Sequence, residues 1–479
     1  MVKTNNKKIH FYLRNCFRSY FIIQSAIIFV LFSISLSFAE NVTFVKEYTY
    51  QASELDSKAS CRTISLEMVK RLLLEELGTY LISETEVKDF KLTKEQVKTY
   101  SAGIVGAEII EDKWDGKTYW LKAKVSADPK EVSKALKKIM DEPFKGKELE
   151  EMRKKAEELT KEVERLNKEL AKATNKQPSK KVKQEYKAAI QGLTAIEWFN
   201  KGYKAGMANK WEEALNAFSK SIELKPDYAK AYAGRGLAYF KLDNYKQAIK
   251  EFDKAIELDP ALAATYVGRG LAYGVLGNHQ QVIKDFTKAI ELNPDLVEAY
   301  VTRGFAYGII GNYKQAIEDY TKAIGLKPDD VSEVYYVRGI SYASLGNHQQ
   351  AIKDLSKAIE LKPDYAEAYA GRGFSYGKLS NDQQAIKDFD KAIELKSDFA
   401  EAYNNRGIAY HKLGNYQQAI KDFTKAIELK PDDADTYRNR GAAYSMLGNY
   451  QQAIKDIKTA AQLGDKLAQD ALLELGEQW

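Results

Sequence analysis

The sequence predicts a mainly α-helical protein: a right-handed α-solenoid of stacked helical hairpins, preceded by a small α+β domain and a coiled-coil-like helix. Three observations indicate this fold. A glycine recurs at steps of 34 residues through the C-terminal half, with an amphipathic helical pattern on either side of it. Residues 147–176 carry apolar residues at heptad spacing, whereas residues 40–142 mix alternating and helical patterns. A chain of 479 residues is also too long for one hydrophobic core.

The first 39 residues have the layout of a secretory signal peptide. A basic stretch precedes an apolar run over residues 21–38, and the small residues Ser37 and Ala39 stand where cleavage would occur. The alternative is an uncleaved anchor, since the apolar run is near the length that spans a bilayer. We expect cleavage after Ala39 and export to the periplasm, with an inner-membrane anchor as the alternative.

Charge and cysteine content narrow the function classes. The leader contributes five of the six net positive charges, so residues 40–479 carry a net charge of only +1. This balance gives no argument for nucleic-acid binding. Cys61 is the one cysteine after the leader, so we expect no internal disulfide and a buried, unreactive thiol.

Residues 40–142 are expected to form the small α+β domain. Strands are predicted over residues 42–52, 108–111 and 118–125. The dipeptide Asp115-Gly116 is a hairpin signal between the last two strands. Helices are predicted over residues 57–77, 93–102 and 128–139. Together they would form a three-stranded sheet covered by helices.

Part of this domain is similar to known envelope domains. The segment GTYLISETEVKDF at residues 78–90, with Tyr100-Ser101-Ala102-Gly103 after it, resembles bacterial envelope domains. That family includes the N-terminal domain of flagellar-assembly outer-membrane proteins and related small lipoprotein domains. The resemblance implies an assembly role in the cell envelope and not catalysis. No flagellar sequence feature accompanies it, so it does not extend to motility.

Residues 147–176 have the apolar seam of a coiled-coil-like helix. Steps of three and four separate Leu149, Met152, Ala156, Leu159, Val163, Leu166, Leu170 and Ala173. Such a seam predicts either a homo-oligomer formed through this helix or a solvated helix that leans on the repeats. The polar run NKQPSKK follows, and we expect a linker over residues 177–194.

The repeated unit is clearest in residues 400–433. An aromatic residue stands four positions before its glycine and a small apolar residue twelve positions after it, and a proline closes most units. The glycines, which number repeats 1 to 8, are Gly202, Gly236, Gly270, Gly304, Gly339, Gly373, Gly407 and Gly441. One step, before Gly339, is 35 residues long. A single hairpin of this length cannot bury both of its faces, so the units must stack.

These features resemble the tetratricopeptide repeat. The resemblance covers eight repeats over residues 195–463, and residues 464–479 would add a capping helix. It implies a superhelix whose first helices line a concave groove for peptide or protein partners.

Four residues break the uniformity of the predicted groove, and we predict that they bind the partner: Tyr336, Asn404, His411 and Arg438. The ninth position of each repeat is apolar, which suits either a groove or the core between helices. The second position is acidic from Glu298 to Asp435 and would form an acidic rim for a partner with basic flanks.

Repeats 2 to 8 share an arginine directly before the repeat glycine and an acidic residue sixteen positions after that arginine. Repeat 1 lacks both. We predict a ladder of charge pairs between stacked helices and not an anion-binding row, because arginine and acid are present or absent together.

No motif specifies an enzyme. The histidines have no metal-ligand spacing, His279 and His348 are expected to be solvated in turns, and no phosphate loop or nucleophile elbow is present. We predict a non-catalytic, exported interaction scaffold without cofactor or metal, whose partners are envelope proteins or peptides and not nucleic acid. After signal cleavage we expect no stable membrane span. The alternatives are a self-assembling structural subunit, and a helper of a cell-wall enzyme that binds glycan or lipid through its N-terminal domain.

Overall fold

The computed structural model describes residues 42–53, 55–83, 97, 105–128, 132, 143–172, 180–326 and 331–475. Two compact units divide these residues, one ending at Leu276 and the other beginning at Gly277, and each is described by itself. The predicted leader lies outside the described residues. So do most of the helices expected over residues 93–102 and 128–139.

Three antiparallel strands form one sheet in the first unit, in the order β1-β3-β2. They are β1 (Val42–Gln51), β2 (Glu108–Trp114) and β3 (Thr118–Ala127). The predicted hairpin joins β2 to β3. Its turn forms because the Asp115 carboxylate accepts hydrogen bonds from the backbone N–H groups of Lys117 at 2.8 Å and Thr118 at 2.6 Å, while Gly116 adopts a φ of +93°.

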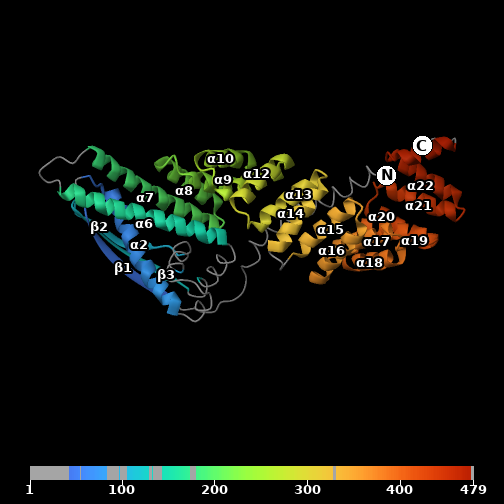
Figure 1. Cartoon of the computed structure of the whole chain (residues 1–479), viewed down its shortest axis with the longest axis horizontal. Helices are drawn as coiled ribbons and strands as arrows, with labels where there is room; N and C mark the ends of the chain where they lie inside the picture. Colours follow the sequence, from blue (N-terminus) through green and yellow to red (C-terminus); the bar gives the residue numbers. More distant parts are fainter. Residues whose placement is uncertain are drawn as a thin grey trace. The chain divides into compact units, whose positions relative to one another are not determined.

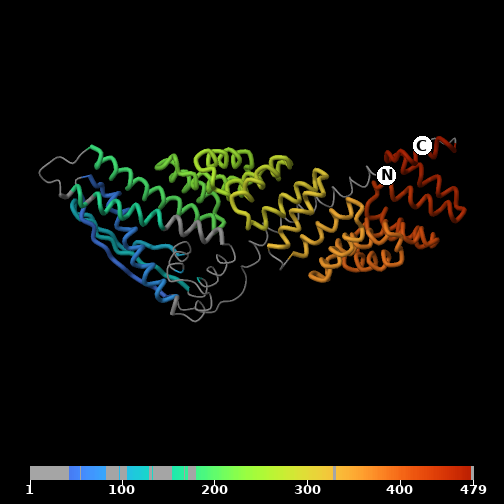
Figure 2. The backbone as a smooth tube through the Cα atoms, viewed as in Figure 1, coloured from blue at the N-terminus to red at the C-terminus, as the bar shows by residue number. Residues whose placement is uncertain are grey.

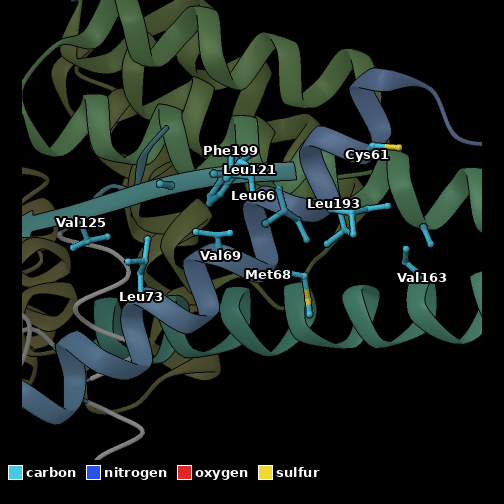
Figure 3. Close-up of a cluster of buried hydrophobic side chains, with 14 of the residues drawn as sticks. Cys61, Leu66, Met68, Val69, Leu73, Leu121, Val125, Val163, Leu193 and Phe199 are labelled. Carbon is cyan, nitrogen blue, oxygen red and sulfur yellow. The ribbon is translucent and has the colours of Figure 1, made fainter. Parts of the chain in front are cut away.

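Helix α2 (Lys58–Ser83) packs against β1 and β3. Figure 3 shows Val69 and Leu73 of α2 near Leu121 and Val125 of β3, all of them buried in one apolar cluster. Cys61 is buried at the start of the same helix, and burial raises the pKa of its thiol to about 12. The thiol is therefore protonated and buried, as expected.

Helices α6 (Pro143–Lys172) and α7 (Lys180–Met207) pack against each other (Figure 1). Val163 and Leu166 of the predicted seam are completely buried in the cluster that α2 and β3 also line. Cδ1 of Leu159 in α6 lies 3.1 Å from the position that a Cβ atom would take on Gly192 in α7. The two helices therefore approach each other closely at this glycine. Along its described part, the seam is therefore covered by this chain and is not free to form a coiled coil with a second copy.

The linker predicted over residues 177–194 is wrong from residue 180 onward, because those residues form the first half of α7. Tyr186, Ala189 and Leu193 are buried on one face of this half. Tyr186 also donates a hydrogen bond of 2.6 Å to Asp56, and its hydroxyl lies 2.9 Å from that of Tyr50 in β1. The polar run at residues 175–181 led to the prediction of a linker, but a helix that joins the sheet to the first repeat begins within it.

The repeats form helical hairpins, which Figures 1 and 2 show in green to red. In the first unit these helices are α7, α8 (Trp211–Leu224), α9 (Ala229–Lys241), α10 (Tyr245–Leu258) and α11 (Ala263–Val275). In the second unit they are α12 (His279–Leu292), α13 (Val297–Ile309), α14 (Tyr313–Leu326), α15 (Ser332–Ser344), α16 (His348–Leu361), α17 (Ala366–Lys378), α18 (Asp382–Leu395), α19 (Ala400–Lys412), α20 (Tyr416–Leu429), α21 (Ala434–Met446), α22 (Tyr450–Gln462) and α23 (Lys466–Glu474). None of the helices in the described ranges is both long and apolar enough to cross a bilayer.

The sequence of repeat 7 shows why its hairpin turns where it does. Gly414 takes a φ of +77° after α19, and the side chain of Asn415 accepts a hydrogen bond from the backbone N–H of Gln418 at the start of α20. The repeat glycine, Gly407, has a different role. A Cβ there would lie 2.7 Å from Phe423, so only glycine lets the two helices approach this closely.

Candidate partner-binding site

The arginine of each repeat has a structural role, shown by Arg372. Its Nε and Nη2 each donate a hydrogen bond of 2.8 Å to one carboxylate oxygen of Asp388, and its Nη1 donates to Ser356 of the preceding repeat at 3.0 Å. Its guanidinium carbon lies 5.5 Å from the centre of the Tyr369 ring. One side chain thus joins two helices of its own repeat and the second helix of the repeat before it.

The same geometry recurs along the chain, which confirms the predicted ladder. Equivalent ion pairs are Arg235–Glu251, Arg303–Asp319, Arg338–Asp354, Arg406–Asp422 and Arg440–Asp456. Arg269 binds Asp253 of the preceding repeat at 2.6 Å. These guanidinium groups already hold carboxylates, so the arginine row is not an anion-binding surface.

The first helices of neighbouring repeats lie side by side, as the contacts of α17 with α19 and of α19 with α21 show. We call the surface of α19 and α21 around Asn405, Ile408, Arg438 and Asn439 the repeat 7–8 face. Three of the four predicted partner-binding residues lie on these two helices, and the fourth, Tyr336, lies on α15.

Tyr336 is not on a surface. Its side chain is buried, and its ring centre lies 4.9 Å from that of Tyr365. The apolar neighbours of repeats 4 to 6 enclose it, so it stabilises the core between helices and has no side-chain surface for a partner. The prediction for Tyr336 is therefore wrong.

Asn404 is also buried, but it is hydrogen-bonded to a half-buried residue of the next repeat. Its Oδ1 accepts a hydrogen bond of 3.2 Å from Nδ2 of Asn439 in the next repeat. Asn404 therefore orients Asn439 and does not itself reach the surface.

Arg438 forms ion pairs that link α21 to the start of the capping helix α23. It forms an ion pair with Asp435 on its own helix and a second, at 3.6 Å, with Asp465. Asp465 caps α23 by accepting a hydrogen bond of 2.7 Å from the backbone N–H of Ala468. The charge of Arg438 is thus largely used within the chain.

His411, at the end of α19, is half-buried beside Tyr416, with ring centres 5.1 Å apart. Burial lowers the pKa of this imidazole, and its Nε2 forms no hydrogen bond to any described residue. The Nε2 atom is itself buried, so it offers no hydrogen-bonding position to a partner.

Sequence reasoning missed Asn405 and Asn439. Both are half-buried, and the Asn405 side chain makes no hydrogen bond within the described part of the chain. They occupy the sixth position of repeats 7 and 8, where repeat 6 has Gly371 and repeat 5 has Val337. Repeat 1 also has an amide there, Asn200, so only the presence of amides in two successive repeats could have identified them.

The predicted acidic rim is partly neutralised. Glu333 lies 3.2 Å from Lys362, and Glu367 lies 3.1 Å from Lys396. In both repeats the lysine directly follows the second helix. These two glutamates therefore carry no unpaired negative charge toward a partner.

The histidines expected in solvated turns are half-buried instead, and this predicts a pH effect. The His348 ring lies 6.2 Å from that of Phe374, and burial, together with the charge of Lys378, lowers the pKa of His348. Because the folded pKa is below the unfolded value, the stability that neutral His348 contributes is fully present above the unfolded pKa and is lost as pH falls through the folded pKa.

We expect His348→Tyr to reduce the loss of melting temperature between pH 7.5 and pH 5, measured by circular dichroism. Tyr416 occupies the equivalent place in repeat 7, so the new side chain fits. An unchanged pH dependence would exclude His348 as its source.

Within the described ranges, no three or more His, Cys, Asp or Glu side chains gather in a way that could hold a metal ion.

Comparison with protein families gives a consistent result for the repeats. A tetratricopeptide repeat model matches residues 229–262, 263–296, 297–330 and 400–433. A second repeat model of this kind matches residues 208–243, 339–380 and 379–414, and a third matches residues 423–455. A search of the curated proteins found no match.

Solved structures similar to this chain include a crystal structure of MamA, with 30% identity and a TM-score of 0.32 over 35% of this chain and 96% of that one. The C-terminal part of a TPR repeat-containing protein from Cytophaga hutchinsonii has 20% identity and a TM-score of 0.43, covering 50% and 98%. YrrB, described as a TPR protein with an unusual peptide-binding site, has 23% identity and a TM-score of 0.28, covering 47% and 97%.

Proposed function

We propose, from the premise that this chain belongs to the tetratricopeptide repeat proteins, that it is a non-catalytic scaffold whose first helices bind a peptide or protein partner in a concave groove. The observation that carries the proposal is the pair of side-chain amides, Asn405 and Asn439, on the repeat 7–8 face. Asn405 is half-exposed, and its hydrogen-bonding groups are unused within the described chain.

An amide offers two N–H donors and a carbonyl acceptor, which match the C=O and N–H groups of an extended peptide backbone. Ile408, half-buried one turn after Asn405 on α19, adds an apolar contact beside them. Backbone recognition by amides with a small apolar contact suits an extended segment of limited sequence specificity. The half-buried ring of His411 lies one turn further along α19 and would contribute to specificity through the part of the ring that is exposed.

We also propose that the protein is exported and that its partners belong to the cell envelope. The basic and apolar leader of residues 1–39, with Ser37 and Ala39 at its end, supports export. The resemblance of residues 78–103 to envelope domains supports the location of the partners. Mass spectrometry of the protein purified from its own cells would test this: a mature N terminus at Glu40 supports cleavage and export, and an intact leader supports the anchored alternative.

The binding proposal is tested by crosslinking capture from an envelope extract, with residues 40–479 as bait. We expect Asn405→Ala combined with Asn439→Ala to reduce the yield of bound partners about tenfold, because several hydrogen bonds to a partner are lost at once. The partners retained by the unaltered bait would be identified by mass spectrometry.

The matched control removes two exposed amides from the second helices, Gln417→Ala with Gln451→Ala. Both variants change two surface amides in repeats 7 and 8, so differences in capture report the position of the amides and not their number. Equal capture by the two variants would refute a role for the repeat 7–8 face. Circular dichroism of each bait checks that the loss of the Asn404–Asn439 hydrogen bond has not unfolded the end of the array.

A further inference from the structure

The most exposed large apolar side chains of the described chain all lie at its C-terminal end. They are Leu475 (67% exposed), Tyr450 (66%), Leu473 (64%), Met446 (57%) and Leu467 (55%). Five such residues within the last repeat and its cap are unlike single apolar residues scattered over a surface, and a concentration of this kind marks an interaction site.

The exposure follows from the length of the cap. Helix α23 has 9 residues, whereas α21, a first helix of ordinary length, has 13. Its inner face packs Ala468 and Leu472 against Ala460 and Ala461 of α22. Because α23 is antiparallel to α22 and shorter than a first helix, it leaves the start of α22, with Tyr450, uncovered.

The outer face of α23 has a symmetric pattern centred on Asp470. Leu467 and Leu473 lie three residues before and after it, and Lys466 and Glu474 lie four residues before and after it; all five side chains are exposed. When two such helices pair antiparallel about a two-fold axis at Asp470, Leu467 of one copy is level with Leu473 of the other. Lys466 is then level with Glu474 of the other copy at both ends. Apart from Asp470 at its centre, the face is therefore complementary to itself in both apolar and charged groups.

We propose that the outer face of α23 is a self-association surface that pairs two copies of this chain antiparallel, end to end. A second copy is the occupant because this face matches its own sequence read in reverse. At the opposite end of the array α7 packs against α2 and α6. The pairing is isologous and closes after two copies, so it forms dimers and not filaments. This proposal does not depend on what the repeat 7–8 face binds.

Asp470 opposes this pairing, which gives the proposal a sharp test. In the dimer, Asp470 of one copy is level with Asp470 of the other, and two like charges at this distance repel each other. Removing the charge with Asp470→Asn is expected to lower the dissociation constant of the dimer about threefold to tenfold. A substitution that merely disturbed the surface would not strengthen association.

The second test reverses charges. Lys466→Glu or Glu474→Lys alone places like charges level at both ends and is expected to raise the dissociation constant about tenfold or more. The double variant Lys466→Glu with Glu474→Lys restores complementarity and should regain the original affinity. The two positions are about 12 Å apart along one helix, at 1.5 Å per residue, so this rescue cannot come from pairing within a single α23.

Neither charge reversal should unfold the cap. Lys466→Glu puts an acid at the N-terminal end of α23 and Glu474→Lys puts a base at its C-terminal end, and both suit the helix dipole. Lys455→Glu, an exposed reversal on α22, serves as the matched control and should leave association unchanged.

Sedimentation equilibrium of the full chain, from micromolar to hundreds of micromolar, measures the wild type and all five variants. We expect a monomer–dimer equilibrium for each protein. Dimer affinity should be highest for Asp470→Asn, equal for the wild type and the double reversal, and lowest for the two single reversals. A monomer at every concentration would overturn the proposal. So would a dimer whose affinity ignores these substitutions, because its interface would then lie elsewhere.

Discussion

Replacing Arg372 with alanine is expected to lower the free energy of unfolding of the repeat array by about 3–5 kcal/mol. The Asp388 carboxylate that Arg372 holds is almost completely buried, and without the guanidinium it becomes an uncompensated buried charge. The substitution also removes the hydrogen bond to Ser356 and the contact with Tyr369. Urea unfolding followed by circular dichroism measures the loss, and hydrogen exchange would show reduced protection of α17 and α18.

A double substitution separates the buried charge from packing. In Arg372→Met with Asp388→Leu both charges are absent, and the cost should be much smaller than that of the single change, because a buried pair is often replaced by apolar residues without loss. If the single and double variants lose equal stability, the buried carboxylate is not the cause. The ladder would then stabilise the array through packing and through the bond to the preceding repeat.

Replacing Phe199 with alanine is expected to destabilise the first unit by about 3–5 kcal/mol. Its buried ring, in α7, has its centre 5.4 Å from that of Phe218 and 5.3 Å from that of Tyr228. The apolar cluster that contains it also contains the residues of α2 and β3 in Figure 3. The sheet, α2 and the first repeats therefore share one core, and a cavity at Phe199 should weaken all of them.

Hydrogen exchange tests this shared core directly. Protection should fall in α2 as well as in α7 and α8 of the Phe199→Ala protein, and Phe199→Leu, which keeps most of the apolar volume, should show a smaller change of the same kind. Unchanged protection of α2 would mean that the N-terminal domain and the repeats unfold independently. Residues 177–194 would then separate two independently unfolding parts of the chain, as the predicted linker implied, even though most of them are helical.

Periodicity explains which features could be predicted. The repeat glycines, the arginine and acid pairs and the hairpin at Asp115-Gly116 each depend on contacts between residues near one another in the chain. Gly407 meets Phe423 sixteen residues later, and Arg372 meets Asp388 at the same separation. A contact between residues at a fixed separation in the chain recurs in every repeat and so produces a periodic sequence pattern. Such a pattern can be recognised from the sequence alone.

The candidate site was harder to predict, because neighbouring positions on one helix differ only in what covers them. Asn404 and Asn405 are the same residue type at adjacent places, but Asn404 is enclosed between α19 and α21 while Asn405 is half-exposed. Tyr336 stood out in the sequence for its size, and it is large because it fills the core beside Tyr365. Departure from the repeat pattern identified unusual residues but not the direction in which their side chains face.

The sequence by itself therefore determined the class of fold, the repeat boundaries and the internal ladder, because local periodic contacts decide all three. Only the tertiary structure decided what the non-repeating helices do. The seam of α6 has the spacing of a coiled coil whether its partner is a second copy or this chain. In the structure α6 packs against α7, and Val163 and Leu166 are buried in one cluster with residues of α2 and β3. The spacing of apolar residues along a helix predicts that one face of the helix is buried. It does not state against which surface, because the hydrophobic effect has no direction and depends only on the area removed from water.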